Sequence, residues 1–223
     1  MIKMRIVEAF IGEYASGKSE NAVNRALELK NLGRTVNLVD LDTVEPFYTL
    51  TPIKKELEAL GLKVLAWERN EVLGFGETGV LLKPEIRWAL KNPGDVIFDV
   101  GYGVHGSRSL NLIEGIWQEP NLKVYAVINA SRPMTREVDD IVEHVKSLDR
   151  VDGLINNTHL GDETTWEVIY DGEEKVLRAA KILGLPVLWT AVDQKLINGN
   201  EEMLQKLKTP VKGLVRYMPK TFW

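Results

Sequence analysis

Residues 12–19, which read GEYASGKS, decide the fold of this chain. They match the pattern G-x-x-x-x-G-K-[ST] at every fixed position, between a β-rich run at 5–11 (RIVEAFI) and a segment of helical spacing at 18–32. In this pattern the glycines let the backbone wrap a phosphate, the lysine reaches the β- and γ-phosphates, and the hydroxyl binds Mg²⁺. The following helix directs its positive N-terminus at the anion. The stretch therefore predicts a phosphate-binding loop for a nucleoside triphosphate.

Outward from this loop, β-rich and helical segments alternate along the 223 residues. The expected strands lie at 5–11, 35–41, 63–67, 95–100, 123–129, 153–157 and 186–191. The expected helices lie at 18–32, 52–60, 84–91, 107–117, 135–148, 171–183 and 201–208. Such alternation implies parallel strands joined by right-handed crossovers, and continuously apolar strands are typical of a sheet covered on both faces. We therefore expect an α/β fold of the P-loop NTPase type. It is a single domain spanning 1–223, a three-layer α/β/α sandwich with a mostly parallel sheet of about seven strands and a proline-containing tail.

Two other predicted strands end in carboxylates. The second strand ends in Asp40-Leu41-Asp42, and the fourth, DVIFDV, ends near Asp99. Ligands of parallel sheets bind beyond the carboxyl ends of the strands, and a triphosphate with Mg²⁺ needs carboxylates to hold the metal and order the attacking water. Asp99 has the form of a Walker B acid, whereas Asp40 has the alternative of a hydrogen bond within the strand end. The predicted metal ligands are Ser19, Asp42 and Asp99, and the predicted catalytic residues are Lys18 and Asp42.

Glycines follow the fourth strand, in the sequence DVGYG at 99–103. The N–H of Gly103 is placed to sense a γ-phosphate. Residues 102–109 (YGVHGSRS) would then form a switch that orders with a triphosphate and relaxes with a diphosphate. His105 and Arg108 lie in this stretch and are expected to be surface residues rather than catalytic ones.

The composition excludes several classes of function. A net charge of −4 argues against general nucleic-acid binding, which needs a basic surface. The absence of cysteine excludes disulfides, thiolate metal sites and cysteine nucleophiles. No apolar run reaches the roughly 18 residues of a membrane span, and Glu8 interrupts the apolar N-terminal segment, so no signal peptide is predicted. The expected location is cytoplasmic, with no nucleic-acid partner and no membrane segment.

The order of these motifs resembles the CobQ/CobB/MinD/ParA nucleotide-binding family, within the SIMIBI class of P-loop NTPases. The resemblance rests on GEYASGKS at 12–19, VDLDTVEPFY at 39–48, DVGYG at 99–103 and LINNTHLG at 154–161, and it spans nearly the whole chain. The phosphate loop alone is generic. Asp-x-Asp after the second strand and Asp-x-x-x-Gly after the fourth are more specific together. The resemblance implies ATP or ADP with Mg²⁺ as the bound cofactor.

In that family an asparagine after a late strand contacts the adenine, and Asn156 or Asn157 matches that position. A carboxamide can donate to and accept from the edge of a base, although an asparagine can also serve a tight turn. The sequence lacks the Asn-Lys-x-Asp element that usually selects guanine, so ATP is favoured over GTP. The residues expected to contact the nucleotide are Gly12, Glu13, Tyr14, Ala15, Ser16, Gly17, Lys18, Ser19, Glu20, Asn156 and Asn157.

Two departures from the family bear on assembly. MinD- and ParA-like members carry a second lysine just after the first glycine of the loop, where this chain has Glu13. That lysine reaches across a nucleotide-sandwich dimer, so the resemblance does not imply such a dimer for this chain. A homodimer of another kind stays among the alternatives. A MinD-like amphipathic membrane helix is not expected at the C-terminus, because Pro210, Gly213 and Pro219 break it.

The leading hypothesis is a slow regulatory or maturation-type ATPase that acts on a protein partner. Phe47, Tyr48 and Trp67 are candidates for a partner-facing surface, with core packing as their alternative. A second hypothesis is an ATP-dependent small-molecule ligase or kinase, in which the glycine-rich segment 73–79 (LGFGETG) is either a substrate loop or a surface loop. A third is a nucleotide-binding subunit that does not hydrolyse ATP.

Overall fold

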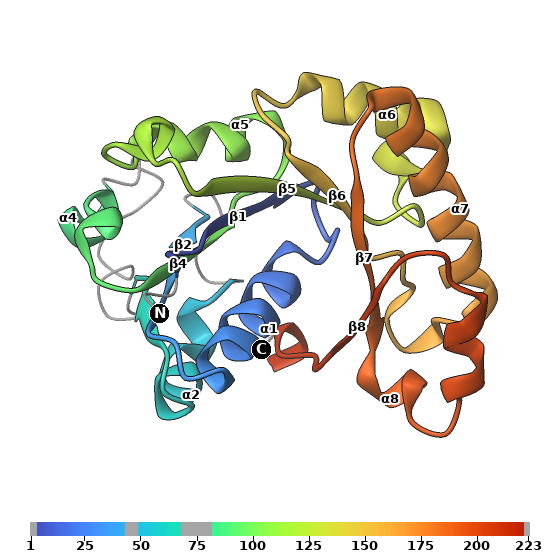
Figure 1. Cartoon of the computed structure of the whole chain (residues 1–223), viewed down its shortest axis with the longest axis horizontal. Helices are drawn as coiled ribbons and strands as arrows, with labels where there is room; N and C mark the ends of the chain where they lie inside the picture. The colour runs from blue at the N-terminus through green and yellow to red at the C-terminus, as the bar shows by residue number, and fades with distance from the viewer. Residues whose placement is uncertain (1–3, 43–48, 68–81, 221–223) are drawn as a thin grey trace.

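An eight-stranded sheet runs through the centre of the molecule, whose computed structural model describes residues 4–42, 49–67 and 82–220 (Figure 1). Neighbouring strands pair in the order β3-β2-β4-β1-β5-β6-β7-β8, and each of these pairings is parallel. The strands are β1 (Val7–Gly12), β2 (Val36–Leu41), β3 (Lys63–Leu65), β4 (Asp95–Val100), β5 (Leu122–Ile128), β6 (Gly153–Asn156), β7 (Val187–Asp193) and β8 (Val211–Leu214).

Helices cover both faces of this sheet (Figure 1). One layer contains α1 (Lys18–Asn31) and α2 (Lys54–Ala59). The opposite layer contains α4 (Pro84–Arg87), α5 (Gly103–Ser107), α6 (Val138–Ser147) and α7 (Trp166–Leu183), and α8 (Gln194–Ile197) follows β7. Short 3₁₀ helices lie at Thr51–Ile53, Ala89–Lys91, Arg108–Leu112, Ile116–Gln118, Pro133–Thr135, Gly161–Glu163, Glu201–Lys206 and Met218–Lys220.

The central strand β1 shows why two helical layers form. Its side chains alternate between the faces of the sheet, as the geometry of a strand requires. Ala9 and Ile11 pack in the core with residues of α4, α6 and α7, whereas Phe10 packs in the other core with residues of α1 and α2. Every residue of β1, β2 and β4 is buried, so these strands are covered on both sides. The predicted α/β sandwich is confirmed.

The sheet has eight strands rather than about seven, and all its pairings are parallel rather than most of them. The additional strand is β8, which the sequence placed in the proline-containing tail. It has only four residues, VKGL, and two of them are a lysine and a glycine, so it carries little strand signal of its own. Its conformation comes from pairing with β7, in which Thr190 to Asp193 face Val211 to Leu214.

Several helices begin or end elsewhere than the sequence predicted. Residues 107–117 do not form one helix, because α5 begins earlier, at Gly103, and two 3₁₀ helices follow it. The predicted 102–109 loop is therefore largely helical. Helix α6 begins after Glu137, whose side chain forms a capping box with Asp140, and α7 begins at Trp166 rather than at 171. The last predicted helix, 201–208, is a 3₁₀ helix at Glu201–Lys206.

The strand order brings the ends of β1, β4 and β2 together. β4 lies between β1 and β2, and the register places Asp40 directly beside Asp99. The phosphate loop, the end of β2 and the end of β4 therefore meet at one edge of the sheet. Among the described helices, none combines the length and the apolar character needed to cross a bilayer.

Candidate functional site

A cavity of about 610 Å³ opens at the carboxyl ends of the strands. Residues of the phosphate loop and Asp42 line one end of it. Residues that follow β6, β7 and β8, such as His159, Asp193 and Arg216, line the other end. A volume of this size is typical of small-molecule and cofactor sites, and its position is the one in which parallel α/β sheets bind ligands.

The two fixed glycines of the loop meet strict steric limits. Gly12 has a φ of 147°, and a Cβ there would lie 2.5 Å from the carbonyl oxygen of Val127. Gly17 has a φ of 91°, and a Cβ there would lie 1.9 Å from Nδ2 of Asn157. Only glycine fits both positions without displacing its neighbours. The loop backbone thus passes close to β5 and to the segment after β6.

Lys18, the first residue of α1, is almost completely buried in this loop. Its ammonium Nζ donates a hydrogen bond to the carbonyl oxygen of Glu13 at 2.9 Å. Burial lowers the pKa of Lys18, and the nearby carboxylates of Asp99 and Asp42 act in the opposite direction. The ammonium and two acids therefore share one enclosed space, as a site for a cation and a polyanion requires.

Asp99 fits the role of a metal-binding acid. Asp99 is 1% exposed and is not among the residues that line the cavity. Within the described part of the chain, no group meets the distance and angle of a hydrogen bond to either carboxylate oxygen, although the Ser19 hydroxyl lies close enough to favour the ionised form. Burial raises the pKa of Asp99 well above its usual value, and the neighbouring Asp40 raises it further. Ser19 and Lys18 act to lower this pKa. A buried carboxyl without a partner is costly, and a bound cation would remove that cost.

Asp40 has a different environment from Asp99. Its carboxylate accepts hydrogen bonds from the Thr49 hydroxyl at 2.7 Å and from the backbone N–H groups of Asp42 at 3.0 Å and Leu50 at 3.3 Å. Burial raises the pKa of Asp40 to about 7. Asp40 therefore bonds to residues on either side of the segment 43–48, namely Asp42 before it and Thr49 and Leu50 after it. This agrees with the alternative role for Asp40, a hydrogen bond within the strand end. Asp42 lines the cavity.

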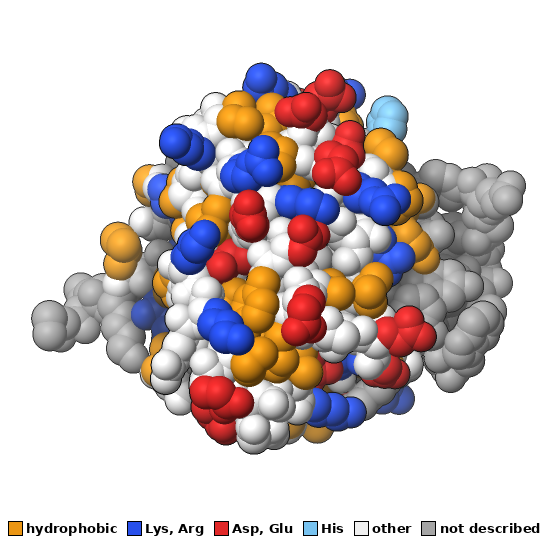
Figure 2. All heavy atoms as spheres, turned by 90° about the vertical axis from the view of Figure 1, so that its right-hand side faces the viewer, with side chains coloured by type: hydrophobic (Ala, Val, Ile, Leu, Met, Phe, Trp, Pro, Cys, Tyr) orange, Lys and Arg blue, Asp and Glu red, His pale blue; other side chains and the backbone are white. Residues whose placement is uncertain are grey.

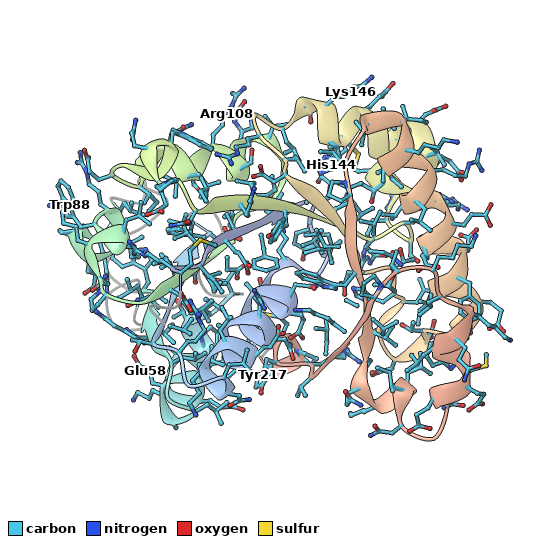
Figure 3. All side chains as sticks on the ribbon, viewed as in Figure 1. Glu58, Trp88, Arg108, His144, Lys146 and Tyr217 are labelled. Atoms are coloured by element: carbon cyan, nitrogen blue, oxygen red, sulfur yellow. The ribbon has the colours of Figure 1, made fainter. Side chains whose placement is uncertain are left out.

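Glu13 is not among the residues that line the cavity, and its carboxylate contacts α6. Its Oε1 lies 3.1 Å from Nδ1 of His144. Figure 3 shows His144 on the inner side of α6, whereas Lys146 points outward. Burial lowers the pKa of His144, and Glu13 opposes this. The residue at the position of the second lysine of MinD- and ParA-like proteins thus makes its side-chain contact within its own chain.

The two candidate asparagines lie in different surroundings. Asn156 is fully buried and does not line the cavity: its Oδ1 accepts a hydrogen bond from the Thr158 hydroxyl at 2.7 Å, and its Nδ2 donates to the Thr190 hydroxyl at 3.2 Å. Asn157 does line the cavity, and its Nδ2 donates to the carbonyl oxygen of Ser16 at 2.8 Å. Of the two, only Asn157 stands against the phosphate loop.

Glu20 links the beginning of α1 to the C-terminal segment. Its carboxylate accepts hydrogen bonds from the backbone N–H groups of Tyr217 and Met218, both at 2.8 Å. Tyr217 lies beside α1 in Figure 3. Burial raises the pKa of Glu20 above its usual value, and these two hydrogen bonds oppose the effect only in part. Glu20 lines the cavity and also holds its C-terminal wall in place.

Aromatic side chains connect the phosphate loop to the segment after β4. The exposed ring of Tyr14 packs edge-on against Tyr102, with centroids 5.5 Å apart, and both residues line the cavity. His105 and Arg108 are exposed, as the sequence predicted. Of the candidate partner-facing aromatics, Trp67 is half-buried, while Phe47 and Tyr48 lie outside the described residues, as does the segment 73–79.

His159 permits a prediction about acid stability. Its Nδ1 accepts a hydrogen bond from the N–H of Gly161 at 3.2 Å, which only the unprotonated nitrogen can do. Burial lowers the pKa of His159 to about 4, and Arg132 contributes in the same direction. Between pH 6.5 and 4 the unfolded chain therefore binds the proton first, so the free energy of unfolding falls as the pH falls. At about 1.4 kcal/mol per pKa unit, the loss is at most about 3.5 kcal/mol.

Urea unfolding of the wild type and of His159→Gln at pH 4, 5, 6 and 7 measures this loss. His159→Gln should show a flatter dependence on pH, whereas a control at the exposed His105, His105→Gln, should keep the wild-type slope. Equal slopes for the wild type and His159→Gln would contradict the assignment.

Arg132 is one of the cavity residues that the sequence patterns missed, as are His159, Asp193 and Arg216. It follows β5 and lies between the phosphate loop and the loop after β6. Its position just beyond a strand, at the edge where ligands bind, was the available signal. No motif includes it, so the pattern alone did not single it out.

No family model and no curated protein sequence matches this chain. Solved structures do match its fold. The cell division protein FtsY from Thermotoga maritima superposes with a TM-score of 0.59 at 16% identity, covering 100% of this chain and 68% of that one. The signal recognition particle receptor FtsY from Elizabethkingia anophelis, in complex with GDP, gives 0.56 at 16% identity over 88% of this chain and 59% of that one. The signal recognition particle 54 kDa protein from Aeropyrum pernix K1, in complex with GDP, gives 0.56 at 19% identity over 100% and 46%.

Together with the parallel sheet, these similarities show that the chain has a fold of the P-loop NTPase type. The chain spans between 46% and 68% of the length of the three solved chains. At these identities the similarity establishes the fold alone.

Proposed function

We propose that this chain is a Mg²⁺-dependent ATP-binding protein of the CobQ/CobB/MinD/ParA kind. It hydrolyses ATP slowly and thereby regulates or matures a protein partner. The observation that carries the proposal is the buried Lys18 ammonium, which lines the phosphate-loop end of a cavity large enough for a nucleotide together with Asp42. The buried carboxyl of Asp99 lies near enough to Lys18 to act on its pKa.

The residues at this end of the cavity have different proposed roles, which follow from their side-chain chemistry. Lys18 binds the β- and γ-phosphates, while Ser19 and Asp99 hold Mg²⁺. Asp42 completes the metal site and orients the attacking water. Within the described ranges no three His, Cys, Asp or Glu side chains converge as a metal-binding group. Magnesium in such a site takes most of its ligands from phosphate and water, so one or two carboxylates suffice.

The far end of the cavity favours adenine. Residues 157–160 read Asn-Thr-His-Leu, so Leu160 stands at the sequence position of the aspartate in the guanine-selecting Asn-Lys-x-Asp element. Leu160 lines the cavity and offers no acceptor for the N1 and N2 donors of guanine. Asp193 also lies there, but it accepts a hydrogen bond from the N–H of Lys195 at 2.9 Å and lies 3.8 Å from Arg216. We assign the contact with the base edge to Asn157, because it lines the cavity and Asn156 does not.

The contact between Glu13 and His144 supports a mechanism without a lysine supplied in trans. We therefore propose that ATP hydrolysis changes the affinity for a protein partner and does not depend on a nucleotide-sandwich homodimer. The proposal does not address homodimers of other kinds. Tyr102 and Tyr14 connect the phosphate loop with the start of α5, so a change at the γ-phosphate can reach the surface there.

Titration with fluorescent ATP and GTP analogues, followed by a phosphate-release assay with Mg²⁺, tests this function. ATP should bind at least about tenfold more tightly than GTP, which corresponds to about 1.4 kcal/mol. Unassisted hydrolysis should be slow, roughly 10⁻⁴ to 10⁻² per second, the range of unassisted P-loop hydrolysis. Preferential GTP binding would overturn the base assignment. Turnover that requires a small carboxylate acceptor would indicate a ligase or kinase, and binding without turnover would indicate a nucleotide-binding subunit.

A further inference from the structure

Arg132 lines the cavity, but none of the expected roles includes it. We propose that Arg132 binds the phosphate chain of the nucleotide from the side opposite α1, as an arginine supplied by the same chain. This inference rests on the proposed function, because it assumes that the cavity takes a nucleotide.

The backbone around Arg132 is anchored to both walls of the cavity. Asn129 donates from Nδ2 to the carbonyl oxygen of Ala15 in the phosphate loop, at 3.4 Å, and to that of His159, at 3.2 Å. The N–H of Arg132 donates to the carbonyl oxygen of Asn129 at 3.0 Å, and its own carbonyl accepts from the N–H of Thr135 at 3.1 Å. The position of Arg132 relative to the phosphate loop is therefore set by hydrogen bonds.

The side chain of Arg132 lacks the partners that other arginines have. Its Nε is buried without a hydrogen-bond partner, and no ion pair to its guanidinium is present in the part of the chain that the structure describes. Arg216, which also lines the cavity, instead pairs with Asp162 and Asp193. A guanidinium is always charged, and a buried donor without a partner costs free energy. An anion in the cavity would supply the missing acceptors.

The surroundings of Arg132 favour phosphate as that anion. Arg132 and His159 both line the cavity, and the guanidinium lowers the pKa of His159 after the larger effect of burial. The other wall of the cavity is the phosphate loop near Ala15, which binds phosphate oxygens through its backbone. The planar guanidinium matches two phosphate oxygens at once, and an arginine at this place spreads the charge of the phosphate chain.

Competition binding tests the proposal with a ligand that has the phosphate chain of ATP but no base. Mg²⁺-tripolyphosphate and Mg²⁺-ATP are each titrated against a fluorescent ATP analogue on the wild type, Arg132→Ala, Arg132→Lys and Arg136→Ala. Arg136 lies in the same segment but is 74% exposed, with Glu137 at 4.0 Å, and provides the matched control. Arg132→Ala should weaken both ligands about tenfold or more, Arg132→Lys should weaken them less, and Arg136→Ala should leave both within about twofold.

The outcomes separate this inference from the proposed function. A wild type that binds neither ligand overturns both. A wild type that binds ATP, with Arg132→Ala binding tripolyphosphate equally well, overturns the role of Arg132 alone. Thermal unfolding of the nucleotide-free variants accompanies the titration, and Arg132→Ala should unfold at the wild-type temperature or above, because it removes an unpaired buried donor.

Discussion

Lys18→Ala is expected to abolish nucleotide binding, with an affinity for Mg²⁺-ATP at least about 100-fold below that of the wild type, or about 2.7 kcal/mol. Lys18 provides a buried positive charge within the phosphate loop, and its ammonium already donates to a loop carbonyl. A polyphosphate bound there without that charge would face Asp42 and Asp99 uncompensated. Titration of a fluorescent ATP analogue measures the loss.

Two further variants separate charge from packing in this experiment. Lys18→Met keeps most of the apolar stem and should lose binding as completely as Lys18→Ala. Lys146→Ala removes one positive charge from the outer face of α6 and should bind normally (Figure 3). Circular dichroism verifies that each variant is folded. If folded Lys18→Met bound ATP with wild-type affinity, the assignment of the phosphate loop would be wrong.

Asp99→Asn is expected to lower kcat for ATP hydrolysis at least about 100-fold, or about 2.7 kcal/mol of transition-state stabilisation, and to raise the stability of the nucleotide-free protein near neutral pH. Burial and the neighbouring Asp40 raise the pKa of Asp99. The folded state therefore binds more protons than the unfolded state above pH 4, so ionisation of Asp99 lowers the free energy of unfolding as the pH rises. A neutral amide removes that loss, together with the charge that would hold the metal.

Asp95→Asn is the matched control, because Asp95 begins the same strand whose end carries Asp99. Burial acts to raise the pKa of Asp95, but its hydrogen bonds with Arg34 and with the N–H of Ile6 outweigh it and lower the pKa. Its stabilising contribution is therefore present above pH 4, and its replacement should destabilise the fold while leaving nucleotide binding intact.

Phosphate release and thermal unfolding, both at pH 7.5, compare these two variants. Asp99→Asn should be inactive and at least as stable as the wild type, and Asp95→Asn should be active and less stable. An Asp99→Asn variant that hydrolysed ATP at the wild-type rate would remove Asp99 from the metal site. A functional residue that costs stability in the free protein is a familiar compromise at active sites.

The local sequence was sufficient to predict the phosphate loop pattern and the order of the strands from β1 to β7. The glycines at 12 and 17 have positive φ angles, which is a local requirement, whereas their close contacts with Val127 and Asn157 come from distant segments. The acids at the ends of β2 and β4 could be placed near the loop because parallel strands present their carboxyl ends at one edge. The distinction between Asp40 and Asp99 needed the hydrogen bonds around each carboxyl.

Only the tertiary structure decided the contacts between segments far apart in the chain. Strand β8 forms because β7 offers it an edge, and Glu13 meets His144 because the sheet order places α6 beside the phosphate loop. Asn156 is enclosed by Thr158 and Thr190, whereas Arg132 is left facing the cavity. Residue type and spacing determine what a side chain can do, and packing between distant segments determines which partners it meets.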